Sequence, residues 1–393
     1  MRRAARTDGA GDSGLSALLG LHALHAAGDA LVAVALAGTL FFSVPIGEAR
    51  GRVALYLLLT LLPFAFLVPV AGPLLDRFRH GRRNVLALAT GGRGLLTWVM
   101  AGKVAGLGLY PLALAVLVLS RAYGVARNAA LPRVRPAGLG LVSGAARVNV
   151  AGAVGTAVAG AIGALVTVLF GPAQVLYLAS LVLIVAGAAA LRLPDQVDEQ
   201  REPERSSLAR MRLRDAPASL RGPLAATCGM RALQGLLTLF LAFLLREQGA
   251  STAAVGVVLG SAALGALLGT VGAARLPSLV PRRLPYYAPG LAALACSVAA
   301  FQPRLLPIAV AAAASGLGGS MAKFGLDATI QASVAGERVS SFFARSETAL
   351  QLSWVTGAAL ALLLPARGSL GFAVGTVLVL SGLVFAVRLS RQP

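Results

Sequence analysis

The chain has 393 residues, of which 57% are hydrophobic and only 13% are charged. Soluble proteins carry about 25% charged residues, so this composition excludes an ordinary soluble domain, a coiled coil and a disordered chain. In a soluble protein the formal net charge of +20 would indicate nucleic-acid binding. Here the arginines lie between long apolar runs, which is typical of membrane orientation. The sequence predicts a polytopic membrane protein that binds no nucleic acid.

Apolar runs recur along the whole chain, and a helix needs about 20 residues to cross a hydrocarbon core of ~30 Å. The predicted crossings are twelve, at residues 15–43, 53–75, 84–107, 110–131, 138–169, 172–193, 222–245, 252–275, 286–302, 304–326, 343–364 and 368–388. With both termini in the cytoplasm, most of the cations outside these runs fall in cytoplasmic segments. The positive-inside rule therefore favours a multi-pass protein of the plasma membrane with both termini cytoplasmic.

One long polar stretch, residues 193–223, separates the sixth and seventh runs and mixes both charge signs with proline and serine. It divides the chain into an N-terminal six-helix half at 1–193, a cytoplasmic linker at 194–221 and a C-terminal six-helix half at 222–393.

An internal repeat relates these halves. Residues 20–25 (GLHALH) correspond to residues 229–234 (GMRALQ), so that Arg231 takes the position of His22, and other segments match in the same order at nearly the same offset. Matches in order at one offset predict two parallel repeats related by an axis along the membrane normal. Transporters built in this way hold their substrate between the halves, near the bilayer midplane.

The strongest local motif follows the second run, where residues 72–83 read GPLLDRFRHGRR. The segment resembles motif A of the major facilitator superfamily, in which a glycine precedes D-R-x-G-R-[RK], with two residues inserted here. Weaker similarities to superfamily motifs lie at residues 121–124 and 155–160. The residues matched to motif A, which would form a conformational latch, are Gly72, Asp76, Arg77, Gly81, Arg82 and Arg83.

The resemblance implies an all-α integral membrane protein with twelve transmembrane helices in two parallel six-helix repeats. It also implies alternating access, and similarity to the drug-efflux and proton-antiporter branches favours a proton-coupled exporter of small lipophilic or amphipathic compounds. The main alternative is a transporter of one defined solute, such as a metabolite, amino acid, organic anion or lipid, in either direction. A transport-inactive receptor or scaffold is a third reading. The expected partners are a small-molecule substrate, protons and the lipid bilayer, and the expected state is a monomer.

Asp29 is the one acidic residue predicted to lie deep in the N-terminal half. His22, His25 and Asp29 are spaced three and four residues apart, so they share one helix face. Ionisable groups inside a membrane are costly and are candidates for function. We predict a proton-coupling site of Asp29, His25 and His22, with His25 as relay or partner. The alternative is that Asp29 only joins helices together.

Other polar residues within the predicted crossings form two groups. A central cavity is predicted from Arg93, Arg121, Arg231, Gln234 and Thr238. If the protein transports one defined solute, Arg93, Arg121 and Arg231 would favour an anionic one. Arg121 is equally compatible with a fixed ion pair to Asp29 or Asp76. A cytoplasmic gate, or else a static interface network, is predicted from Lys323, Asp327, Arg345 and Glu347.

The sequence has no nucleophile elbow, phosphate-binding loop or zinc-protease motif, so we expect a protein that is not an enzyme and needs no cofactor. Its two cysteines, Cys228 and Cys296, predict neither a disulfide framework nor a metal site. A metal site built on His22, His25 and Asp29 would need a further ligand that the sequence does not suggest.

Overall fold

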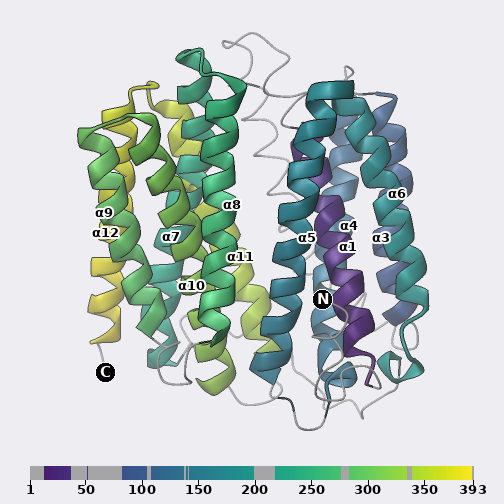
Figure 1. Cartoon of the computed structure of the whole chain (residues 1–393). Coiled ribbons are helices and arrows are strands. Elements are labelled where there is room, and N and C mark those ends of the chain that lie inside the picture. The colour runs from purple at the N-terminus through teal and green to yellow at the C-terminus, as the bar shows by residue number, and fades with distance from the viewer. Residues whose placement is uncertain are drawn as a thin grey trace. The chain divides into compact units, whose positions relative to one another are not determined.

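The computed structural model describes residues 13–36, 82–103, 108–136, 141–198, 217–275, 283–333 and 339–391, with the single residues 51 and 139. Within these ranges the regular elements are helices (Figure 1). The α-helices are α1 (Leu15–Leu36), α3 (Arg82–Ala101), α4 (Leu109–Val134), α5 (Leu141–Phe170), α6 (Pro172–Leu191), α7 (Ala218–Glu247), α8 (Thr252–Arg275), α9 (Leu284–Phe301), α10 (Leu305–Ser333), α11 (Val339–Leu363) and α12 (Gly368–Ser390). The predicted crossing at 53–75 lies outside the described residues.

The prediction of an all-helical, multi-pass membrane protein is confirmed. Nine of the described helices are long and apolar enough to cross a membrane, judged by length and composition. Many large apolar side chains on them point outward; Phe170, for example, is 69% exposed and Leu306 is 74% exposed. A helix that is hydrophobic on every side suits a lipid environment, because lipid chains cover its outer face.

Glycine fixes two of the sharp turns between helices. Gly171 has φ +88° and separates α5 from α6, and Pro172 then begins α6 at a position where a missing N–H costs nothing. Gly249, with φ +62°, follows the end of α7. There the Gly249 N–H donates to Arg246 O and the Ala250 N–H donates to Leu245 O, which is the Schellman arrangement. These turns reverse the chain over a few residues.

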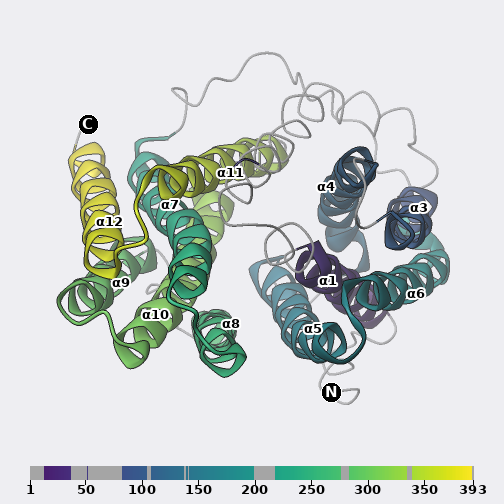
Figure 2. The same cartoon turned by 90° about the horizontal axis from the view of Figure 1, so that it is seen from above.

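The chain divides into two compact units, Met1–Arg205 and Ser206–Pro393. In the first unit α1 packs against α5 and α6, while α3 packs against α4 and α6 (Figure 2). In the second unit α7 packs against α11 and α12, while α9 packs against α10 and α12. Of the predicted linker at 194–221, the structure describes a short 3-10 helix, η3 (Asp195–Val197), and the start of α7, whereas residues 199–216 lie outside the described part.

One close backbone contact occurs in both units. A Cβ atom on Gly155 of α5 would overlap the carbonyl oxygen of Ala23 on α1. In the second unit a Cβ atom on Gly357 of α11 would overlap the carbonyl oxygen of Ala232 on α7. Ala23 and Ala232 occupy matching places in the GLHALH and GMRALQ segments. Small residues let membrane helices approach closely, so α1 meets α5 in the first unit in the same way as α7 meets α11 in the second.

Candidate functional site

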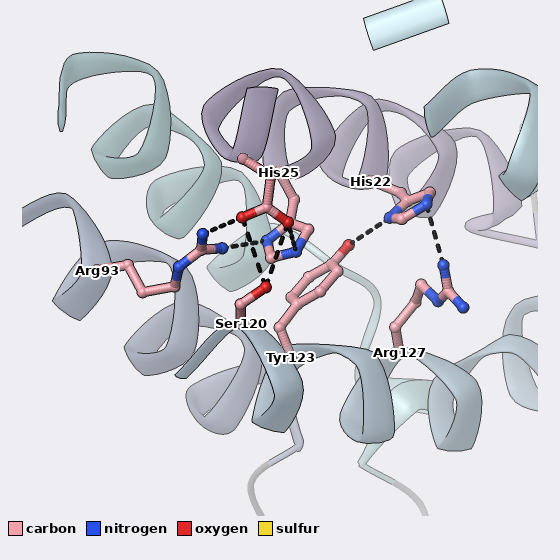
Figure 3. A network of polar contacts seen from close by, with 7 residues as sticks. His22, His25, Arg93, Ser120, Tyr123 and Arg127 are labelled. Carbon is pink, nitrogen blue, oxygen red and sulfur yellow. Dashed lines mark hydrogen bonds and ion pairs between the residues drawn. The ribbon is translucent and has the colours of Figure 1, made fainter. Parts of the chain in front are cut away.

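A network of polar side chains joins α1, α3 and α4 in the first unit (Figure 3). Its members are His22, His25, Asp29, Arg93, Ser120, Tyr123 and Arg127. The three predicted proton-coupling residues all belong to it, as does Arg93, which was expected in the cavity. The network has two hydrogen-bonded groups, one around Asp29 and one around His22.

The Asp29 carboxylate has a partner on each of three helices. The guanidinium of Arg93 on α3 donates to Oδ1, and the Ser120 hydroxyl on α4 lies 3.2 Å from Oδ2. His25, one turn earlier on α1, places Nε2 3.3 Å from Oδ2. The Asp29 side chain is nevertheless 42% exposed. The carboxylate is thus held in place but remains accessible from one side.

Arg93 is much more enclosed than its partner. It is only 1% exposed, although an arginine is rarely buried unless it is paired. Besides Asp29 it contacts His25, whose Nδ1 lies 3.2 Å from Nη1 of Arg93. Its Nε atom and the hydroxyl of Thr97, one turn further along α3, are buried without a hydrogen-bond partner among the described residues. The Asp29 charge is therefore the main compensation for a buried cation.

The second group surrounds His22, nearer the start of α1. Nε2 of His22 lies 3.0 Å from Nη1 of Arg127, and Nδ1 of His22 lies 3.4 Å from the Tyr123 hydroxyl. The Tyr123 ring, which is 1% exposed, stacks on His25 with 3.5 Å between ring centroids. Tyr123 therefore connects the two groups, by a hydrogen bond to one histidine and by ring stacking on the other.

Close helix packing brings Arg93 to Asp29. A Cβ atom on Gly187 of α6 would lie 2.9 Å from Cα of Gly91 on α3, and one on Gly94 would lie 3.0 Å from the Ser180 carbonyl oxygen. On α1, a Cβ atom on Gly28 would lie 2.5 Å from Leu183 of α6. Because α6 packs closely against both α1 and α3, it holds these two helices near enough for the polar side chains of α1 and α3 to contact each other.

A second charged cluster lies in the other unit. Nζ of Lys323 on α10 lies 2.5 Å from Oδ1 of Asp327 and 2.7 Å from Oε1 of Glu347 on α11. The spacing of Lys323 and Asp327 on one helix predicted their pairing, and the structure extends it to Glu347. Arg345 is half-buried on the same helix as Glu347. These ion pairs join two helices of a single unit, and the gating role stays a prediction.

The other residues expected in a central cavity lie on α4 and α7. On α7, Nη1 of Arg231 donates to Oε1 of Gln234 at 3.2 Å, and the Thr238 hydroxyl donates to the Gln234 carbonyl oxygen at 2.6 Å. Arg121 is exposed on α4. The ion pair that the structure gives Asp29 is with Arg93 on α3.

Most of the motif A segment lies outside the described residues, namely Gly72, Asp76, Arg77 and Gly81. The last two motif residues begin α3 and contact the chain that follows α6. Arg83 forms ion pairs with Asp195 at 2.5 Å and Asp198 at 2.6 Å, and its own N–H donates to Oδ1 of Asp198. Arg82 donates to the Val197 carbonyl oxygen. Asp198 thus caps α3 and ties the start of the linker to the motif.

The network is not arranged to hold a metal ion. Both ring nitrogens of His22 and of His25 already face a partner. Among the described residues there is also no group of three or more histidine, cysteine or acidic side chains placed to bind one.

Three members of the network were given no site role from the sequence: Ser120, Tyr123 and Arg127. Their spacing of three and four residues places them on one face of α4, which is the signal that could have identified them. The role of these three side chains could not be predicted from that spacing, because nothing in the sequence showed which helix this face of α4 would contact.

The comparisons with known proteins cover almost the whole chain, although no protein-family model matches it. An uncharacterized protein of Mycobacterium leprae is 35% identical over 428 residues, covering 98% of this chain and 73% of the relative. Uncharacterized proteins from two strains of Mycobacterium tuberculosis are also 35% identical, covering 98% of this chain and 75% of theirs.

Solved structures show the fold. The human organic anion transporter MFSD10 (TETRAN) superposes with a TM-score of 0.72 at 16% identity, covering 95% of this chain and 99% of that one. A bacterial homologue of the iron transporter ferroportin, in its outward-facing state, gives a TM-score of 0.68 at 16% identity, with 96% and 100% covered. The chain therefore belongs to one family with the mycobacterial proteins, and its fold is that of the major facilitator superfamily transporters.

Proposed function

We propose that this protein is a secondary transporter of the plasma membrane in which protonation of Asp29 is coupled to the movement of a small molecule. The observation that carries the proposal is the unequal enclosure of one ion pair. Arg93 is 1% exposed, whereas Asp29 is 42% exposed. A proton can reach the carboxylate from its open side, while the arginine stays fixed behind it.

Protonation would change the charge balance of the site. The pair of Asp29 and Arg93 has no net charge when the carboxylate is ionised, and a proton on Asp29 leaves the buried guanidinium uncompensated. An unpaired buried charge costs several kcal/mol, so the protonated site favours any arrangement in which Arg93 gains solvent or another partner. A conformational equilibrium that depends on one proton is what coupled transport requires.

The position of Asp29 along its helix agrees with this role. It is the fifteenth residue of α1, about 21 Å from the start at 1.5 Å per residue, so a helix that begins at one membrane surface would place it near the midplane. In transporters built from repeats the substrate and coupling-ion sites lie at that depth. We propose the complete architecture to be twelve transmembrane helices in two parallel repeats, with both termini cytoplasmic.

For the substrate we propose small lipophilic or amphipathic compounds, exported in exchange for protons. The largely apolar composition of the helices supports this class, since few charged groups are available to bind a strongly polar solute. The alternative is one defined solute, in particular an organic anion. Arg121 and Arg231, one on each unit, support the alternative, as does the structural likeness to an organic anion transporter.

The test uses purified protein in liposomes that enclose a pH-sensitive dye, with a panel of lipophilic cations and organic anions. Wild type should move protons when substrate is added, and Asp29→Asn should not. The matched control is Glu247→Gln, the same change of carboxylate to amide at an exposed residue at the end of α7, outside the network. The direction of proton flow distinguishes antiport from symport. Equal substrate-driven proton flux in wild type and Asp29→Asn would refute the assignment of Asp29.

A further inference from the structure

Each histidine of the network faces an arginine through one ring nitrogen. Nη1 of Arg93 lies 3.2 Å from Nδ1 of His25, and Nη1 of Arg127 lies 3.0 Å from Nε2 of His22 (Figure 3). An arginine guanidinium carries only N–H donors and no acceptor. The nitrogen that faces it must therefore offer a lone pair, and cannot itself carry a proton.

The remaining nitrogen of each ring then carries the hydrogen. For His25 this is Nε2, which lies 3.3 Å from Oδ2 of Asp29 and donates to that carboxylate. For His22 it is Nδ1, which lies 3.4 Å from the Tyr123 hydroxyl and donates to that oxygen. The hydrogen bond at one nitrogen decides which nitrogen carries the proton, so the two imidazoles have opposite tautomers.

From this arrangement we infer that Arg93 and Arg127 hold His25 and His22 as neutral imidazoles of fixed, opposite tautomers. His25 then acts as a positioning residue that donates a hydrogen bond to Asp29, and does not carry the transported proton. The inference rests on the proposed function for its role in transport, but the tautomers themselves follow from the contacts. It decides between the two roles that the sequence left open for His25, relay or partner.

The groups that face the two rings support a neutral state. Two arginines, from α3 and α4, lie at hydrogen-bond distance, and a second proton on either ring would place two cations against each other. The one carboxylate in the network, Asp29 on α1, is already paired with Arg93. From α4 the neighbouring side chain is the hydroxyl of Tyr123, and from α5 Gly152 lies beside the His22 ring and presents no side chain to it.

Gly152 also explains how the His22 ring is held. A Cβ atom at this position would lie 2.6 Å from Nε2 of His22. The absence of a side chain leaves room for the imidazole and the Arg127 guanidinium to meet. Gly152→Ala is therefore a variant that displaces the His22 ring without removing any polar group.

The direct test is nitrogen NMR on the full-length protein with ¹⁵N-labelled histidine in lipid nanodiscs. The chain has three histidines, so His80→Gln and Gly152→Ala allow the signals to be assigned. We expect one protonated and one unprotonated nitrogen in each of His22 and His25, with opposite patterns, at every pH where transport is active. A doubly protonated ring at either position, or the same tautomer at both, would overturn the inference, and this result does not depend on transport.

The functional test compares His25→Gln with His25→Ala in the liposome assay. A glutamine amide can donate from a place near Nε2 but cannot bind a second proton. We expect His25→Gln to keep substrate-driven proton flux within about threefold of wild type, less than 1 kcal/mol, with the same pH profile. His25→Ala should change that profile. Loss of proton flux in His25→Gln, with substrate binding retained, would show that His25 carries the proton. If wild type itself shows no substrate-driven proton flux, that result counts against the proposed function and leaves the tautomers to the NMR test.

Discussion

The ion pair of Asp29 and Arg93 should give a strongly asymmetric response when one partner is removed. Asp29→Asn leaves a guanidinium that is 1% exposed without its counter-charge. Loss of one partner from a buried pair costs about 3–5 kcal/mol, and an arginine at the centre of a membrane helix costs about 3 kcal/mol. We therefore expect Asp29→Asn to lower the free energy of unfolding by about 3 kcal/mol.

The reverse change should cost less. Arg93→Met leaves a carboxylate that is 42% exposed and still accepts hydrogen bonds from Ser120 and His25. Partial solvation reduces the penalty for that group to about 1–2 kcal/mol. The double variant removes both charges and keeps the side-chain volume similar, so it should return to within about 1 kcal/mol of wild type.

The assay is unfolding in mixed detergent micelles, with helix content followed by circular dichroism for the two single variants, the double variant and wild type. The control Asp195→Asn, at a carboxylate that is 87% exposed, should change stability by less than about 0.5 kcal/mol. The reasoning fails if Arg93→Met is as damaging as Asp29→Asn, or if the effects of the two single variants add in the double variant. Either result would mean that burial does not decide which charge needs its partner.

Three further outcomes are expected from contacts elsewhere in the two units. Gly155→Ala should destabilise the first unit by about 1–3 kcal/mol, because the added Cβ atom forces α5 away from α1. The control Gly160→Ala, on the same helix with open space around it, should have little effect when the two are compared by thermal melting in detergent. Asp198→Ala removes the cap from the start of α3 and should cost about 1 kcal/mol in the same melt, and an unchanged melting temperature would show that the cap contributes nothing. Lys323→Met leaves the carboxylates of Asp327 and Glu347 facing each other, so the double variant with Asp327→Asn should be more stable than Lys323→Met alone, and the opposite order would contradict the ion-pair geometry.

Much of the architecture could be predicted from the sequence, because hydrophobic length is a strong constraint in membranes. The predicted run at 252–275 matches α8 at both ends, and the run at 172–193 differs from α6 only at its end. The run at 304–326 was too short. The structure continues α10 to Ser333 because Lys323 and Asp327 are paired within the helix, and their charges therefore do not end it.

The site could be predicted only in part. The shared face of His22, His25 and Asp29 follows from helical spacing alone. The choice of Arg93 as the partner of Asp29 depends on α6 holding α1 and α3 together through Gly28, Gly91 and Gly187. The chain has 46 glycines, and no local pattern distinguishes those that touch another helix from those that face open space.

The backbone contacts at Gly155 and Gly357 limit how this family can vary. In each case the neighbouring atom is a carbonyl oxygen, of Ala23 or of Ala232, which every amino acid possesses. A larger residue at either glycine cannot be accommodated by trimming the side chain opposite, as it can in an ordinary core. A saturation mutagenesis scan should therefore find these two positions intolerant whatever second-site changes accompany them, while exposed apolar residues of the same helices, such as Val158 and Leu352, should accept most apolar substitutions.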